Sequence, residues 1–74
     1  MVKLPSLSAK ELVKILHKLE YRIVRQTGSH VRMKSLENGR KPLTIPNHKE
    51  IGRGLMRKII RNAGISSEDF KKLI

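Results

Sequence analysis

Apolar residues recur at helical spacing near the start of the chain. The first stripe consists of Leu12, Val13, Ile15, Leu16 and Leu19. Spacings of three and four place most of these residues on one side of a helix. The preceding segment, from Ser8 to Glu11, has the form of a capping box, in which each of these two side chains accepts a backbone N–H of the other residue. We therefore predict a helix from about Ala9 to Leu19.

A second helical stripe occurs towards the end of the chain. It consists of Leu55, Met56, Ile59, Ile60 and Ala63. Gly64 follows at the position of a left-handed C-terminal cap. Because Gly52 and Gly54 disfavour an early helix start, we expect residues 47–54 to form a loop. Ser66 is the expected N-cap of a short terminal helix, which Phe70, Leu73 and Ile74 are expected to anchor.

Three stretches between the two stripes have strand patterns. The segment from Tyr21 to Gln26 is aromatic and β-branched and lacks Gly and Pro. After a turn at residues 27–29, apolar and polar residues alternate from His30 to Lys34, so Val31 and Met33 face one side of the sheet. His30, Arg32 and Lys34 face the other side. Residues 42–46 form a short third strand whose prolines suit an edge, and Asn38-Gly39 before it is a strong hairpin signal.

The order of these elements predicts an α+β fold in one domain over residues 1–74. We expect a three-stranded antiparallel sheet with helices on one face and a short extra C-terminal helix. This α-β-β-β-α order is that of the double-stranded RNA-binding fold. The helices need an apolar surface, and the Val31/Met33 face is the one available, so the His30 face should remain in water.

The net charge of the chain limits the classes of binding partner to consider. Seventeen Lys and Arg face six Asp and Glu, which gives a net charge of +11. Such an excess favours nucleic acid, an anionic membrane surface or an acidic protein as partner. No apolar run approaches the roughly 18 residues of a membrane helix, so we expect a cytoplasmic protein without a membrane partner. One Tyr and one Phe cannot form a base-stacking platform, so RNA binding should depend on phosphate and 2′-hydroxyl contacts.

The candidate chemistry centres on histidine. His17 is expected on a helix surface and His48 in a loop near the end of the sheet, whereas His30 opens a strand beside Arg32 and Lys34. RNA carries its own nucleophile, the 2′-hydroxyl, and an imidazole can take or give its proton near neutral pH. Arg and Lys can stabilise the charge that grows on the phosphate. The few acids are scattered and cysteine is absent, so we expect no metal site and no cofactor.

Four segments, in the right order, resemble the HicA toxin family. Residues 25–30, Arg-Gln-Thr-Gly-Ser-His, resemble its RQ-x-G-S-H signature, and residues 43–48 are similar to the segment with V/I-P-x-H that follows it. Residues 51–66 resemble the family's Gly- and Leu-containing helix, which ends in A-G-I-S, and residues 10–16 also fit. The resemblance implies an RNA-binding-like fold, a cytoplasmic ribonuclease that acts on messenger RNA (an mRNA interferase), and an antitoxin resembling HicB.

The resemblance also assigns roles to residues. The family's catalytic histidine falls on His30. The further residues expected to bind RNA are Arg25, Ser29, Arg32, Lys34, His48, Arg53, Arg57 and Lys58. This chain departs from the family at two places: Glu20-Tyr21 stands where a glycine often follows the first helix, and Val31 stands where a second histidine often follows the first. The acid for the leaving group is therefore unassigned, with His48 as a candidate helper.

Two other hypotheses stay open on the sequence alone. The charge and the element order are also typical of a non-catalytic double-stranded RNA-binding module. An acidic protein could equally dock on the basic helices, and this role is compatible with catalysis because an antitoxin must cover the site. Incubation of purified protein with labelled RNA separates cleavage from RNA binding without cleavage.

Overall fold

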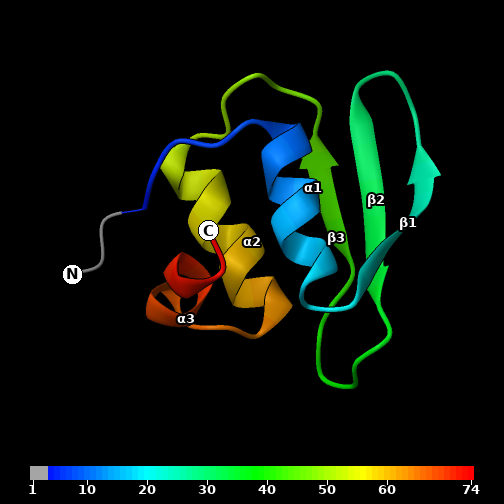
Figure 1. Cartoon of the computed structure of the whole chain (residues 1–74). Helices are drawn as coiled ribbons and strands as arrows, with labels where there is room; N and C mark the ends of the chain where they lie inside the picture. Colours follow the sequence, from blue (N-terminus) through cyan, green and yellow to red (C-terminus); the bar gives the residue numbers. More distant parts are fainter. Residues whose placement is uncertain (1–3) are drawn as a thin grey trace.

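The computed structural model describes residues 4–74, so the first three residues of the predicted domain lie outside the described residues. Its elements, in chain order, are α1 (Ala9–His17), β1 (Tyr21–Gln26), β2 (His30–Ser35), β3 (Leu43–Pro46), α2 (Arg53–Ala63) and α3 (Ser67–Lys72) (Figure 1). The strands form an antiparallel sheet in the order β1-β2-β3. The predicted α+β class and element order are confirmed.

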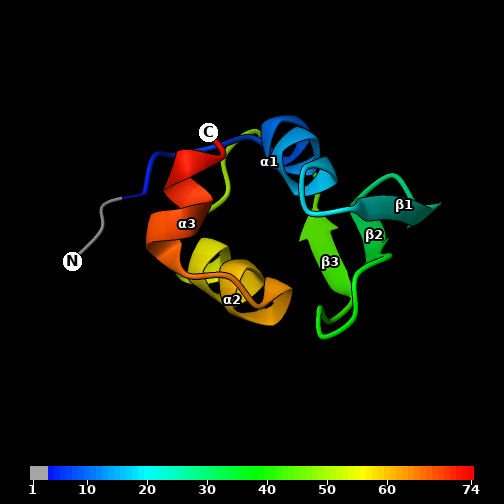
Figure 2. The ribbon, with the colours of Figure 1, turned by 60° about the horizontal axis from the view of Figure 1, so that its bottom comes forward.

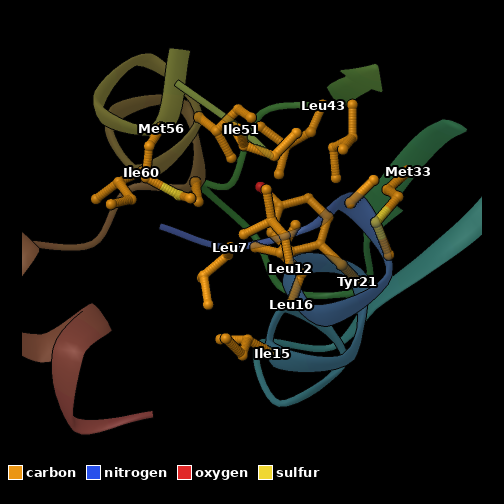
Figure 3. Packing of buried hydrophobic residues seen from close by; sticks show 14 of the residues in the cluster. Leu7, Leu12, Ile15, Leu16, Tyr21, Met33, Leu43, Ile51, Met56 and Ile60 are labelled. Carbon is orange, nitrogen blue, oxygen red and sulfur yellow. The ribbon is translucent and has the colours of Figure 1, made fainter. Parts of the chain in front are cut away.

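The helices cover one face of the sheet (Figure 2). α1 contacts β1, α2 lies against β3, and α3 packs on α2. The buried residues of the sheet are Tyr21, Val31, Met33, Leu43 and Ile45. They belong to one hydrophobic cluster with residues of α1 and α2, and Figure 3 shows part of it, including Leu12, Leu16, Met56 and Ile60. Burial alternates along β2 as predicted, with Val31 and Met33 inside. Within residues 4–74, no helix is long and apolar enough to cross a membrane.

Tyr21 is the polar exception in this apolar layer. Its ring is buried, and its hydroxyl donates a hydrogen bond of 2.7 Å to the carbonyl of Lys41. Burial raises the pKa of the Tyr21 phenol above its usual value. The phenol therefore stays neutral at physiological pH and serves as a buried donor that ties β1 to the loop before β3.

The first helix begins as predicted and ends early. The capping box is present: the Ser8 N–H donates to Glu11 Oε1 at 3.0 Å, and the Glu11 N–H donates to Ser8 Oγ at 3.1 Å. The backbone N–H of Ser8, and after it the Ser8 hydroxyl, lowers the pKa of Glu11. The helix ends at His17 rather than Leu19, because the Leu19 N–H bonds to Leu16 in a tighter turn. Leu19 is nevertheless buried.

The second helix begins earlier than predicted. Residues 47–54 were expected to be loop, but α2 starts at Arg53 with Gly52 as its extended N-cap. Gly54 therefore lies inside the first turn, where glycine costs about 1 kcal/mol relative to alanine. Met56, two residues on, is buried, and its N–H donates to the Gly52 carbonyl at 2.9 Å, which closes this first turn. The prediction for Gly64 is confirmed, with a left-handed φ of 74°.

The C-terminus and the loop between β2 and β3 differ in part from the prediction. Ser66 caps α3 and Phe70 is buried as expected, whereas Ile74 is 52% exposed and anchors nothing. Asn38-Gly39 does not make a two-residue hairpin, because β2 ends at Ser35 and β3 begins at Leu43. The longer loop is instead tied to the end of α2, where Arg40 donates to the Ala63 carbonyl at 2.6 Å. An arginine there satisfies a carbonyl that the helix leaves unpaired.

Candidate nucleic-acid interface

The face of the sheet turned away from the helices is exposed and basic. His30, Arg32 and Lys34 alternate with the buried residues of β2 and are all exposed, as predicted. Across the ladder, Arg32 stands opposite Arg25 and Lys34 stands opposite Arg22. This surface, the cationic face, therefore consists of His30, Arg22, Arg25, Arg32 and Lys34.

A bulge in β1 gives Arg25 its place on this face. The pairing of β1 with β2 shifts register between Ile23 and Arg25, which leaves Val24 unpaired. Strict alternation from buried Tyr21 would point Arg25 towards the helices. The extra residue restores Arg25 to the outer side, opposite Arg32. Two arginines thus meet on neighbouring strands because of one inserted position.

Like charges directly opposite each other destabilise a sheet. The six acids of the chain do little to relieve this cost. Glu20 pairs with Arg22 at 3.1 Å, Glu37 pairs with Arg40, and Asp69 lies near Lys72. Glu11 and Glu50 bond to serines, and Glu68 forms no ion pair within the described residues. In the part of the chain that the structure describes, no acid pairs with Arg25, Arg32 or Lys34. The cationic face is therefore suited to an anion from outside the chain.

His30 is held at the end of this face by a small hydrogen-bonded turn. Its N–H donates to Thr27 Oγ1 at 3.1 Å, and its carbonyl accepts from the Thr27 N–H at 2.9 Å. The loop after β3 holds the same turn, since the Asn47 N–H donates to the Ser29 carbonyl at 2.9 Å and Asn47 Nδ2 donates to the Gly28 carbonyl at 3.3 Å. The backbone beneath the imidazole is thus fixed from two segments.

The imidazole itself has one polar contact. Ser29 Oγ lies 2.9 Å from His30 Nδ1. A hydroxyl can donate or accept, so the contact suits either protonation state of the ring. With Nδ1 engaged, Nε2 is the nitrogen left for a ligand. This arrangement can carry a proton to or from an anion that lies on the cationic face.

The other predicted site residues lie further from this turn. His48 follows Asn47, but its carbonyl accepts from the Ala9 N–H at the start of α1, which fixes its backbone at the helical layer. Arg53 lines a separate cavity beside residues 4–6, and Arg57 is exposed on the same helix. Lys58 lies nearer, because it lines one cavity together with Arg32. The structure thus brings together Arg25, Ser29, His30, Arg32 and Lys34, with Lys58 at the border.

Three residues of the site were not singled out from the sequence. Arg22 stands opposite Lys34, Thr44 accepts a hydrogen bond of 2.8 Å from Arg32, and Asn47 holds the turn below His30. Thr44 carried a usable signal, since it alternates with the apolar Leu43 and Ile45. Asn47 carried none, because its contacts depend on how two loops meet.

The described residues contain no group of three His, Cys, Asp or Glu side chains placed to hold a metal ion.

The fold and the cationic face define a small α+β domain with a strongly basic sheet surface. The family model described as HicA toxin of bacterial toxin-antitoxin matches residues 9–65 of this chain, and the chain belongs to that family. No curated protein and no solved structure matches it. Membership implies the toxin of a toxin–antitoxin system and suggests an antitoxin partner.

Proposed function

We propose that this toxin is an endoribonuclease that cleaves messenger RNA without a metal ion, with His30 as its acid/base group. One observation carries the proposal. An exposed imidazole, hydrogen-bonded at Nδ1 by Ser29, stands on a face where Arg25 and Arg32 oppose each other without an acid between them. The RNA backbone satisfies both features, because its phosphodiester brings negative charge to the arginines and its ribose brings a 2′-hydroxyl proton to the imidazole.

The reaction needs groups of the RNA, the imidazole and arginines of this face, and one further proton donor. His30 Nε2 takes the 2′-hydroxyl proton, and the 2′-oxygen attacks the adjacent phosphorus. Arg25 and Arg32 stabilise the charge on the non-bridging oxygens. The bond to the 5′-oxygen then breaks, which leaves a 2′,3′-cyclic phosphate, and the 5′-oxygen departs with a proton. His48, exposed in the loop after Asn47, is the candidate donor of that proton.

The remaining cations have a binding role in this proposal. Lys34 extends the cationic face away from His30 and meets a neighbouring phosphate. Lys58, Arg53 and Arg57 lie on α2 and contact the RNA beyond the edge of the sheet. Each cation that neutralises a phosphate of single-stranded RNA contributes about 0.7 to the slope of log affinity against log salt.

The experiment uses end-labelled RNA and the purified toxin in EDTA. We expect cleavage to continue, and the products to carry cyclic phosphate ends. A matched oligonucleotide with one 2′-deoxy nucleotide at the cut should lose that cut alone. Cleavage that stops in EDTA would exclude the metal-free mechanism. RNA that is bound and stays intact under every condition would instead establish the non-catalytic RNA-binding module.

The antitoxin in this proposal resembles HicB and acts by occlusion. A masking protein should offer acidic side chains to Arg25, Arg32 and Lys34, because these cations lack acidic partners within the described chain. We expect the complex to shift the NMR signals of the even-numbered residues of β2 and to block cleavage. A complex that leaves the His30 face open to solvent would contradict occlusion.

A further inference from the structure

A cavity of about 230 Å³ opens at the free edge of β3, where the sheet meets α2. Figure 2 shows that β3 is the strand beside α2. The cavity is lined on the sheet side by Arg32, Pro42 and Thr44, and on the helix side by Leu55, Lys58 and Asn62. It is therefore the place where the cationic face of the sheet continues into the basic surface of α2.

The cavity has a cationic rim with free donors. Arg32 Nη1 donates to Thr44 Oγ1 at 2.8 Å, which directs the guanidinium towards β3. An arginine carries five N–H donors, so this bond leaves others for a ligand. Lys58 approaches from α2, and within residues 4–74 no acid is bonded to it. Arg32 of the sheet and Lys58 of α2 can thus bind the same phosphate.

Between Arg32 and Lys58, the lining of the cavity is partly apolar and partly an uncharged amide. Pro42 is exposed and Leu55 is half-buried, so both offer apolar surface to a ligand. The backbone carbonyl of Asn62 accepts the Lys41 N–H, while the Asn62 side-chain amide retains donors and an acceptor. An apolar surface beside an amide fits the face and the edge of a nucleobase, whereas a simple anion-binding site would need neither.

We propose that this cavity holds one unpaired nucleotide of the RNA, with its phosphate on Arg32 and Lys58 and its base against Pro42, Leu55 and the Asn62 amide. The inference rests on the proposed function and adds the substrate class, which is single-stranded RNA. A base inside a duplex is stacked and paired on both sides and cannot enter such a cavity without being turned out. In this arrangement the RNA strand runs from His30 across Arg32 to α2.

The test measures binding in a His30→Ala background, so that the RNA stays intact. The probes are a short labelled single-stranded RNA and the same strand in a full duplex. Lys58→Ala should weaken binding of the single strand about tenfold, as expected for a lost charge-assisted phosphate contact. Arg61→Ala is the matched control, because Arg61 is an exposed cation on the same helix and does not line the cavity. It should weaken binding about twofold or less, as a screened surface charge does.

Four outcomes decide between these possibilities. A larger loss for Lys58→Ala than for Arg61→Ala, with a single strand bound more tightly than the duplex, supports the nucleotide site. Coupling of Lys58→Ala with Arg32→Ala, where the double variant loses less than the two losses combined, places both cations on one phosphate. Equal losses for Lys58→Ala and Arg61→Ala overturn the site and leave cleavage by the wild-type toxin as a separate result. If no RNA binds, both this inference and the proposed function fail.

Discussion

The two faces of β2 differ in both burial and charge. Val31 and Met33 are buried against the helices, while His30, Arg32 and Lys34 lie in water. The buried face is apolar apart from one satisfied tyrosine hydroxyl, and the exposed face opposes two pairs of cations. Six consecutive residues therefore serve stability and the site in alternation. Substitutions on the two faces should therefore have separable effects on stability and on RNA binding.

The largest expected effect is on the buried face. Met33→Ala removes a fully buried side chain and should destabilise the domain by about 2–5 kcal/mol, a large share of the stability of so small a domain. Thermal unfolding followed by circular dichroism measures it. Arg32→Ala, the exposed neighbour, should leave the melting temperature within a few degrees of wild type. Equal destabilisation by both substitutions would contradict the division between the faces.

The second prediction concerns the Tyr21 hydroxyl, the polar group within the buried face. Tyr21→Phe removes the hydrogen bond to the carbonyl of the exposed Lys41 and should cost about 0.5–1.5 kcal/mol, the net contribution of one hydrogen bond. The raised pKa of the phenol adds a pH dependence. Because the folded-state pKa lies above the unfolded value of about 10, this contribution is complete below that pH and is lost as the pH rises through the folded-state pKa. Alkaline unfolding should therefore be less steep in the Phe variant; identical curves would refute the buried donor.

Glu20 lies in the turn before β1, outside both faces of β2. Its φ of 62° is left-handed, a conformation that costs a non-glycine residue about 1–2 kcal/mol. Glu20→Gly should raise the unfolding free energy by about 1 kcal/mol, less the small contribution of the exposed Arg22 ion pair. RNA binding should be nearly unchanged. A lower melting temperature in this variant would show that the ion pair matters more than the backbone conformation.

The smallest effect on stability is expected on the exposed face. Arg25→Thr removes one of two opposed arginines and should stabilise the sheet by a few tenths of a kcal/mol. The same substitution should weaken RNA binding and reduce the salt slope by about 0.7. Titrations at several salt concentrations measure both quantities. A variant that is more stable and binds RNA as well as wild type would remove Arg25 from the site.

Much of this division was predictable, because it depends on local periodicity. The alternation from His30 to Lys34, the capping box at Ser8 and the left-handed Gly64 are each encoded by neighbouring residues. The start of α2 was not predictable in this way, because the local preference of Gly52 and Gly54 points to a loop, whereas α2 starts at Arg53 and packs against β3.

The geometry of the site was harder to predict from the sequence, because it depends on contacts between residues far apart in the chain. The bulge at Val24 depends on how β1 pairs with β2, and it alone brings Arg25 opposite Arg32. The bond from Arg32 to Thr44 joins residues twelve positions apart, and Asn47 reaches the His30 turn from another loop. The sequence indicated which face carries the site, whereas strand pairing decides which cations meet there.

The central claim is that the imidazole of His30 performs the cleavage, and the most direct measurement compares two histidine variants. His30→Ala and His17→Ala are assayed for RNA cleavage in EDTA after circular dichroism has confirmed that both are folded. His17 is the matched control, because it lies on α1, where its Nδ1 contacts the Tyr21 carbonyl at 2.8 Å. We predict a loss of about 10²–10⁴-fold for His30→Ala and little change for His17→Ala. Full activity in folded His30→Ala would contradict the account.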